Sequence, residues 1–482
     1  MMFCQLIFLP LRFLNPIHGI IILGVYLSLC CGCHHESDVL GLLPIRVVTT
    51  SGDRSLLFSQ SSIDFSARVE DTLPVIHIDP TKTFQSVDGF GFTLTGSSAL
   101  LLHQLSQGTR HDILKELFGA KDSSIDISCL RLSIGASDLD PEVFSYDDLP
   151  PGKVDPQLKS FSLSRDTLHL IPILKEILAI QADLMIIASP WSPPPWMKTN
   201  LQSNGGSLLP AYYETYALYL THYISLMASN GITIDAITIQ NEPQNDKNNP
   251  SLLMSSREQA NFIKNHLGPL FRSKNLKTKI LIWDHNCDQP EFPLEILSDT
   301  SAYPFVSGSA FHLYGGDIHA LSRVHDSFPA KDLYFTEQWT GAKSDFEGDL
   351  NWHIKNVIIG SMRHWSRTAL EWNLANDIQY GPHTDGGCTE CLGSLTIDGE
   401  HIQKNVAYYI IAHASKYVVP GSIRIDSNMP DELANVAFIT PGGKTVLIVL
   451  NESIEAKKFN IEAGGKIIQT SLIGKAVATY EW

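Results

Sequence analysis

Residues 184–191 read Leu184-Met185-Ile186-Ile187-Ala188-Ser189-Pro190-Trp191, an apolar run that ends in polar and aromatic side chains. A strand that is apolar on both faces is typical of a parallel sheet covered by helices on both sides. Similar runs recur along the chain. The eight strands that they predict are Gly89–Leu94, Ile125–Ile134, Leu184–Pro190, Ile234–Asn241, Thr278–Asp284, Gly308–Tyr314, Leu333–Glu337 and Ala369–Leu374.

Amphipathic stretches that predict helices separate these runs, for example residues 212–227 and 257–271. Eight strand–helix units over about 300 residues indicate a (β/α)8 TIM barrel, an α/β fold. The whole chain has 482 residues, of which 44% are hydrophobic and 18% are charged. It is therefore globular, and it is long enough to hold a second domain beside the barrel.

The second domain is predicted from both ends of the chain. Beyond residue 417 the predicted strands are short: Asn435–Thr440, Thr445–Leu450, Lys457–Ile461, Ile467–Leu472 and Ala476–Trp482. Before the barrel they are Leu43–Thr50, Ser55–Gln60 and Pro74–Ile78. Because domain termini usually lie close together, we expect one β-sandwich side domain. The expected divisions are a lipoprotein-type signal segment at 1–33, N-terminal sandwich strands at 34–85, the catalytic barrel at 86–404 and the C-terminal sandwich part at 405–482.

The N-terminus has the features of a targeting segment. Residues 19–29 are nearly all apolar, a run of signal-peptide length that is too short to span a bilayer comfortably. The following pair, Gly32-Cys33, resembles the cleavage site of a bacterial lipoprotein signal. We therefore expect an exported protein of the cell envelope, attached to a membrane through a lipidated Cys33. The alternatives are an ordinary cleaved signal, for a periplasmic or secreted protein, and a membrane anchor.

The remaining cysteines are Cys129, Cys287, Cys388 and Cys391. Export permits a disulfide, and the close pair Cys388 and Cys391 predicts a local one in a loop. Cys129 and Cys287 are expected to be buried strand thiols. A zinc site would need two more ligands at regular spacing, which the sequence does not supply near the pair.

The formal net charge of −16 comes from 35 basic and 51 acidic residues. This balance argues against a nucleic-acid partner, because such binding depends largely on Lys and Arg neutralising phosphates. It suits a soluble protein that acts on a neutral ligand.

Two of the predicted strands end in a glutamate. The first reads Ile237-Thr238-Ile239-Gln240-Asn241-Glu242-Pro243, and the second reads Leu333-Tyr334-Phe335-Thr336-Glu337-Gln338-Trp339. A retaining glycosidase needs one carboxylic acid to protonate the leaving oxygen and one carboxylate to attack the anomeric carbon. The paired strand-end glutamates therefore predict glycoside hydrolysis, although a single Glu at a strand end is usually no more than a solvated residue.

Polar or aromatic side chains also follow the other strands. They are Thr93, Arg131 with Asp138 beyond it, Trp191, Asp284-His285-Asn286, His312 and Tyr314, and Trp372-Asn373. Barrel enzymes place their active sites at the C-terminal ends of the strands, so we expect these groups to meet. Asp284 and His285 have no recognisable third ligand, so neither a metal nor a cofactor is expected.

These residues resemble glycoside hydrolase family 30, the group of lysosomal glucosylceramidase and bacterial β-1,6-glucanases, from about residue 84 onward. The motifs that carry the resemblance are Gly89-Phe90-Gly91, Arg131-Leu132-Ser133-Ile134, Ala188-Ser189-Pro190-Trp191-Ser192-Pro193-Pro194-Pro195-Trp196-Met197-Lys198-Thr199-Asn200, Asn241-Glu242-Pro243, Glu337, Glu371-Trp372-Asn373-Leu374 and His413-Ala414-Ser415-Lys416-Tyr417-Val418-Val419-Pro420-Gly421-Ser422. The family's sandwich, which is also built from both termini, agrees with the domain organisation expected above.

The resemblance implies a role for each matching residue. Glu242 corresponds to the general acid/base and Glu337 to the nucleophile. Asn241 corresponds to the residue that holds the sugar 2-hydroxyl, and Tyr314 to a tyrosine near the nucleophile. The residues that correspond to the lining of the sugar subsite are Arg131, Asp138, Trp191, His312 and Trp372. Core packing remains the alternative for His312 and for each tryptophan, and ion pairing with the carboxylates remains the alternative for Arg131.

Two expectations concern the chemistry. An ionised Glu337 would raise the pKa of Glu242, because like charges disfavour a second ionisation. Trp339 follows the nucleophile by two residues, so in an extended strand both would face the barrel mouth. An indole there would form a wall for the next sugar and would leave little room for a ceramide tail.

The sequence thus favours a retaining β-glycosidase, most specifically a β-1,6-glucanase, acting on a β-glucan or glucoside. Glucosylceramidase and β-xylosidase are the alternatives within the same family. A non-catalytic, sugar-binding envelope lipoprotein is the alternative of another class, but it would have lost a catalytic carboxylate, and both are present.

Overall fold

The computed structural model describes residues 44–66, 70, 72–121 and 123–482. The expected signal segment, including Gly32 and Cys33, lies outside this part of the chain. Among the described residues, none of the helices has the length and apolar character needed to cross a membrane.

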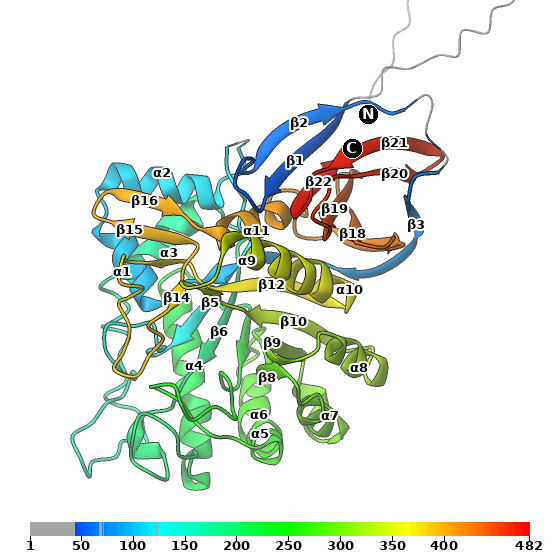
Figure 1. The fold of residues 1–482 in the computed structure, drawn as a ribbon. Coiled ribbons are helices and arrows are strands. Elements are labelled where there is room, and N and C mark those ends of the chain that lie inside the picture. Colours follow the sequence, from blue (N-terminus) through cyan, green and yellow to red (C-terminus); the bar gives the residue numbers. More distant parts are fainter. Residues whose placement is uncertain (1–43, 67–69, 71, 122) are drawn as a thin grey trace, which may run out of the picture. The chain divides into compact units, whose positions relative to one another are not determined.

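The predicted barrel is confirmed. Eight parallel strands close in the order in which they follow along the chain (Figure 1). They are β4 (Gly89–Thr93), β5 (Cys129–Ile134), β6 (Met185–Pro190), β7 (Ala236–Thr238), β8 (Lys279–Cys287), β9 (Gly308–Gly316), β10 (Asp332–Glu337) and β12 (Ser366–Asn373). Most bounds agree with the prediction to within a few residues. Strand β7 is shorter and ends before Asn241, so Glu242 lies beyond it.

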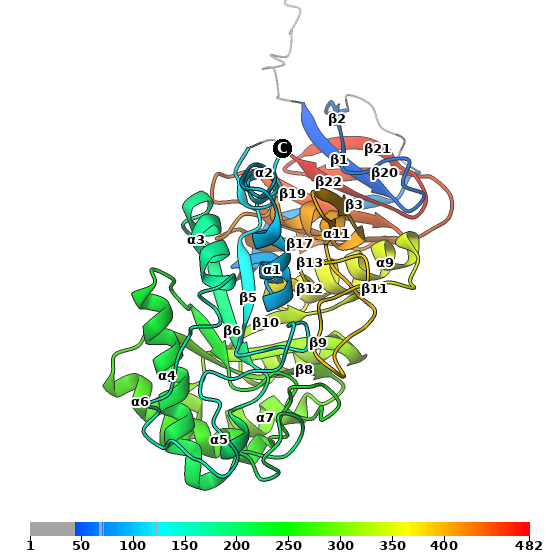
Figure 2. The ribbon, with the colours of Figure 1, turned by 90° about the vertical axis from the view of Figure 1, so that its left-hand side faces the viewer.

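Helices surround the barrel, as Figures 1 and 2 show. Their bounds are α1 (Gly96–Gln104), α2 (Gln107–Phe118), α3 (Leu170–Ile180), α4 (Tyr213–Ser229), α5 (Ser256–Phe262), α6 (Gly268–Ser273), α7 (Glu291–Ser298), α8 (His319–Ser327), α9 (Phe346–His353), α10 (Ser361–Arg363) and α11 (Val406–Ser415). The helix predicted over 212–227 corresponds to α4. The helix predicted over 257–271 is interrupted by a π-helical turn at Ile263–Leu267.

The side domain is built from both ends of the chain, as predicted. It contains β1 (Ile45–Ser51), β2 (Ser59–Ile63), β3 (Val75–Ser86), β17 (Ile423–Ser427), β18 (Leu433–Ile439), β19 (Thr445–Asn451), β20 (Lys457–Ala463), β21 (Lys466–Leu472) and β22 (Ala476–Glu481). Strand β1 pairs with β22, and β3 pairs with β17 and β20. The blue and red strands of Figure 1 therefore lie side by side. The sequence did not indicate β17.

The sandwich has an inner core and a second apolar face. Residues such as Ile76, Leu447 and Phe459 pack inside it. On the alternate positions of the same strands, Phe438 and Ile448 belong instead to the core cluster that fills the space around the barrel. The two domains are thus joined by continuous apolar packing.

The segment after β12 adds small sheets that the sequence did not indicate. Strand β11 (Thr340–Gly341) pairs with β14 (Cys391–Leu392), and β13 (Ala375–Asn376) pairs with β15 (Leu395–Asp398), which in turn pairs with β16 (His401–Lys404). The predicted disulfide between Cys388 and Cys391 is present and joins the loop before β14 to the first residue of that strand. Cys129 and Cys287 are buried free thiols, as expected.

Candidate active site

The barrel interior is layered by the alternation of side chains along each strand. An apolar layer contains residues such as Cys129, Ile187 and Ala310. Two residues further along the same strands, the inward positions hold Arg131, Ser189 and His312, all buried. Because successive side chains point to opposite faces of a strand, this spacing returns each polar group to the interior. A polar layer therefore lies above an apolar one, toward the C-terminal ends of the strands.

Arg131 and Asp284 form the centre of the polar layer. Nη2 of Arg131 donates to Oδ2 of Asp284 (2.8 Å), and Nη1 donates to Oε2 of Glu337 (2.6 Å). Neither Arg131 nor Asp284 has solvent exposure, and the adjacent guanidinium, with His312, outweighs burial and holds the pKa of Asp284 well below its usual value. A buried charge is tolerated only when paired in this way. The pair therefore anchors the carboxylate of Glu337, the predicted nucleophile.

Asp284 reaches the interior through an irregularity in β8. The register with β9 shifts between Trp283 and His285, and Trp283 and Asp284 both have positive φ angles (73° and 65°). Hydroxyl groups of Ser189, Thr238 and Thr336 donate to its carboxylate at 2.7–2.8 Å. The local strain is offset by these hydrogen bonds and by the ion pair with Arg131.

Glu242 lies on irregular backbone just after β7. Its φ angle is 46°, and its N–H donates to the carbonyl oxygen of Asp284 (3.0 Å). Nδ2 of Asn245 donates to Oε2 of Glu242 (2.7 Å). The carboxyl is therefore positioned by a turn and a side-chain amide, in place of the extended strand that the sequence predicted.

His312 lies between the two catalytic candidates. Its Nδ1 is 3.2 Å from Oε1 of Glu242 and 3.7 Å from Oε1 of Glu337, and its Nε2 is 3.2 Å from Oδ1 of Asp284. One carboxylate oxygen from each of Glu242 and Glu337 and one ring nitrogen of His312 all lie within 4.8 Å of one another. Carboxyls of retaining glycosidases are about 5–5.5 Å apart and those of inverting enzymes are further apart, so this spacing fits double displacement.

The expected rise in the pKa of Glu242 is wrong. Burial acts in that direction, but the hydrogen bond and charge of His312 outweigh it and lower the pKa of Glu242 to about 2. Burial opposes the charged form of His312 too, yet the charge of Glu337 and the bonds to Asp284 and Glu242 raise its pKa to about 9. Burial raises the pKa of Glu337, against the charges of His312 and Arg131. One proton is thus held by the Glu242–His312 pair.

A pocket of about 340 Å³ opens above these groups. It is lined by Asp138, Trp191, Asn241, Glu242, Asn245, Asn248, His285, Asn286, Tyr314, Glu337, Trp339, Trp372, Cys388 and Cys391. Arg131 and His312 are fully buried and do not line it; they contact the carboxylates of Glu337 and Glu242 instead. The other predicted site residues are brought together as expected.

One wall of the pocket is aromatic. The rings of Trp191 and Trp372 are 5.5 Å apart, and both lie over the guanidinium of Arg131, at 4.8 and 5.9 Å. Trp339 packs against the same cluster. Strand β10 ends at Glu337, so Trp339 reaches the pocket from a loop, and the strand alternation expected from the sequence does not apply.

Two polar contacts prepare the pocket for its ligand. The hydroxyl of Tyr314 donates to Oε1 of Glu337 (2.8 Å). Oδ1 of Asn241 accepts from Nη2 of Arg131 (2.7 Å), which fixes the amide so that its Nδ2 is the group left to donate to a sugar hydroxyl.

The sequence reasoning did not single out Asn245, Asn248 or the two cysteines as pocket residues. Asn245 and Asn248 belong to the polar loop after Glu242, where the only signal was the run Gln244-Asn245-Asp246-Lys247-Asn248-Asn249. Among the described residues, Glu242, His312 and Glu337 are the group that could bind a metal ion. Arg131, Tyr314 and Asn245 donate hydrogen bonds to three of its four carboxylate oxygens, and the fourth, Oε1 of Glu242, faces Nδ1 of His312.

Comparison with known proteins finds matching family models and similar relatives. The family model described as "Glycosyl hydrolase family 30 TIM-barrel domain" matches residues 87–418. The model described as "Glycosyl hydrolase family 30 beta sandwich domain" matches residues 421–480. "Endo-1,6-beta-D-glucanase BGN16.3" of Trichoderma harzianum is 32% identical over 406 residues, covering 78% of this chain and 80% of that protein. "Lysosomal acid glucosylceramidase" of Mus musculus is 28% identical over 436 residues, covering 85% and 83%.

A solved structure is also similar to this chain. "The endo-beta1,6-glucanase BT3312" superposes with a TM-score of 0.86 at 33% identity, and the match covers 91% of this chain and 99% of that chain.

Proposed function

The chain belongs to glycosyl hydrolase family 30, and from this premise we propose that it is a retaining β-glycosidase that hydrolyses β-1,6-linked glucan. The observation that carries the proposal is the placement of Glu242 and Glu337 on either side of His312. One carboxylate oxygen of each glutamate and one ring nitrogen of His312 lie within 4.8 Å of one another. That spacing suits one carboxylate that attacks the sugar and one group that protonates the leaving oxygen.

In the first step, a carboxylate oxygen of Glu337 attacks the anomeric carbon. Arg131 and Tyr314 hold this carboxylate in place. Glu242 delivers the proton that it shares with His312 to the glycosidic oxygen, and the leaving sugar departs. The result is a glycosyl ester on Glu337 and a Glu242 carboxylate beside a neutral His312.

In the second step, water attacks the anomeric carbon from the side of Glu242. The ester carries no charge, so the electrostatic effect that raised the pKa of His312 is weaker during this stage. Glu242 accepts the proton from the water, the ester bond breaks, and the Glu242–His312 pair recovers its proton. Two displacements at the same carbon retain the anomeric configuration.

The polymer assignment is supported by the amide groups that line the pocket. They belong to Asn245, Asn248 and Asn286, and Trp339 lines the same pocket. Amide groups donate and accept hydrogen bonds, so they suit the hydroxyls of a second sugar better than a lipid chain. Curated relatives named as endo-1,6-β-D-glucanases, including one from Aspergillus fumigatus that is 32% identical over 395 residues, support the same linkage.

A substrate panel tests the proposal. Purified protein is incubated with β-1,6-glucan, β-1,3- and β-1,4-glucans, xylan and glucosylceramide, and released sugars are measured, with Glu337→Gln as the inactive control. We expect the highest kcat/KM on β-1,6-glucan. Faster hydrolysis of glucosylceramide, or of xylan, would reject the polymer assignment while leaving the glycosidase in place.

We propose also that the protein is exported and lipid-anchored in the cell envelope. The support is the apolar run at residues 19–29 followed by Gly32-Cys33. Mass spectrometry of the native protein should find an acylated N-terminal Cys33, and Cys33→Ser should release the protein from membranes. An unmodified N-terminus downstream of Cys33 would indicate a secreted enzyme instead.

A further inference from the structure

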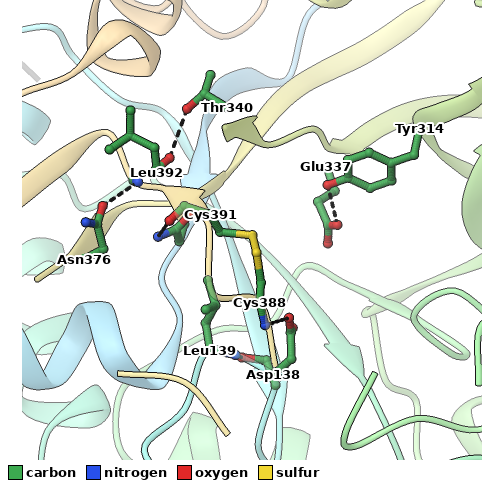
Figure 3. The surroundings of a disulfide bond; sticks show 12 residues. Asp138, Leu139, Tyr314, Glu337, Thr340, Asn376, Cys388, Cys391 and Leu392 are labelled. Carbon is green, nitrogen blue, oxygen red and sulfur yellow. Dashed lines mark hydrogen bonds between the residues drawn. A yellow bond between two sulfur atoms is a disulfide. The ribbon is translucent and has the colours of Figure 1, made fainter. Parts of the chain in front are cut away.

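The Cys388–Cys391 disulfide forms part of the pocket wall. Both cysteines line the pocket, and the bond closes residues 388–391, called here the disulfide turn. Figure 3 shows the sulfur atoms between the two arms of the turn, with Asp138 beside Cys388 and the Tyr314–Glu337 pair on another side of the site. The turn is therefore placed to affect the ligand directly.

The first arm of the disulfide turn holds Asp138. The N–H of Cys388 donates to Oδ2 of Asp138 (3.4 Å). Upstream of the turn, the N–H of Thr384 donates to the carbonyl oxygen of Asp138 (2.9 Å). Asp138 is only 5% exposed and lines the pocket. The orientation of its carboxylate thus depends on backbone whose position the disulfide fixes.

The second arm braces the segment that carries Trp339. Strand β14 pairs with β11, whose first residue follows Trp339 directly. The N–H of Ala342 donates to the carbonyl oxygen of Glu390 (2.9 Å). The hydroxyl of Thr340 donates to the carbonyl oxygen of Leu392 (2.9 Å). Any shift of this arm would therefore move the backbone beside Trp339.

Between the two arms, the disulfide belongs to an apolar cluster. Cys391 is buried with Leu139, Trp191 and Trp372, and Cys388 and Trp339 pack against them. Sulfur–aromatic contacts are favourable and depend on position. The bond thus joins the loop after β5, the loop after β10 and the aromatic wall into one surface.

We propose that the Cys388–Cys391 disulfide determines sugar binding by fixing Asp138 and Trp339 in one arrangement. The disulfide is a positioning element, and it takes no part in the displacement steps because Glu242 and Glu337 are held by other contacts. The proposal rests on the glycosidase assignment but not on the polymer. An aryl β-glucoside therefore tests it whether or not β-1,6-glucan is the substrate.

The test compares oxidised and reduced enzyme. The protein is treated with a phosphine reductant, and alkylation with mass spectrometry verifies that Cys388 and Cys391 have become thiols. We expect KM for an aryl β-glucoside to rise by about tenfold, the order of magnitude for weakening one hydrogen bond to the ligand. The inhibition constant of deoxynojirimycin, a glucose-shaped ligand, should rise equally. We expect kcat to change by less than about twofold, because the displacement machinery is untouched.

Two variants serve as controls. The double variant Cys388→Ser/Cys391→Ser should have the raised KM from the start and should not respond to the reductant, which excludes effects at other cysteines. Glu390→Gln removes the exposed ion pair with Lys343 on the same turn but keeps the backbone bond to Ala342. It should leave KM and kcat unchanged.

The outcomes are distinct. An unchanged KM after verified reduction would overturn the proposal, as would a loss confined to kcat. An equal response of the double variant to the reductant would also overturn it, because the effect would then arise elsewhere. If the double variant fails to fold, the reduced native enzyme still decides the matter.

Discussion

At the scale of single residues, the site is a network of paired buried charges. Arg131 forms ion pairs with both Asp284 and Glu337, and the Glu242–His312 pair holds one proton. The sequence indicated these residue types but not their electrostatics. The sign of the Glu242 pKa shift depends on His312, which approaches Glu242 from a strand 70 positions away along the chain, and no local pattern reveals that distance.

The first prediction concerns His312 and activity. Activity needs the shared proton, which is lost as pH rises through the pKa of His312, about 9. In His312→Gln the proton has to reside on Glu242 alone, so the alkaline limb of the kcat/KM profile should move to lower pH. At neutral pH we expect kcat/KM of His312→Gln to be about tenfold to hundredfold lower than that of the wild type. An unchanged alkaline limb would mean that His312 does not hold the proton.

The second prediction concerns His312 and stability. Its pKa is raised from 6.5 to about 9 on folding, so its contribution is fully present below pH 6.5 and is lost as pH rises through 9. The shift corresponds to about 3 kcal/mol. Denaturant unfolding from pH 6 to 10 should show this fall in the wild type and a weaker one in His312→Gln. Parallel curves would contradict the assignment.

At the scale of elements, apolar runs were enough to place the barrel strands because both faces of each strand are buried. The runs could not show where hydrogen bonding stops. Glu242 lies past β7 and Trp339 lies past β10, each on irregular backbone, and Asp284 turns inward at a bulge in β8. Tertiary contacts set these ends. The segment after β12 escaped prediction because its strands are very short.

The third prediction concerns Trp339, on the loop between β10 and β11. Its indole lines the pocket, which Asn245 and Asn248 line as well. Trp339→Ala should raise KM for a β-1,6-linked glucose oligosaccharide by about tenfold, since aromatic contacts with a ligand are large apolar surfaces. KM for a small aryl glucoside should rise less, because that substrate does not extend to the wall. Equal losses on both would assign Trp339 a structural role.

At the scale of the whole molecule, barrel and sandwich share apolar packing through Phe438 and Ile448. The sequence indicated a sandwich from both termini. Alternation of apolar and polar residues along its strands could not show that the outer face of the sandwich packs against the barrel. Because it does, the side domain contributes to the stability of the catalytic barrel.

The fourth prediction follows from this packing. Phe438 is fully buried, and Phe438→Ala should lower the free energy of unfolding by about 3–5 kcal/mol. Because the core is continuous, barrel and sandwich should still unfold in a single transition, measured by calorimetry and by tryptophan fluorescence. Two separate transitions, with the barrel unaffected, would show that the domains are independent. KM of the folded fraction should not change.

The central claim is that Glu337 forms a covalent bond to the sugar, and trapping that intermediate tests it most directly. The enzyme is incubated with 2-deoxy-2-fluoro-β-glucosyl fluoride, which slows both displacement steps but leaves a good leaving group, and is digested for peptide mass spectrometry. We expect one fluoroglucosyl ester, on the peptide that contains Glu337, and no label on Glu337→Gln. A label on another residue, or turnover of β-glucoside to a product of inverted configuration without any label, would contradict the claim.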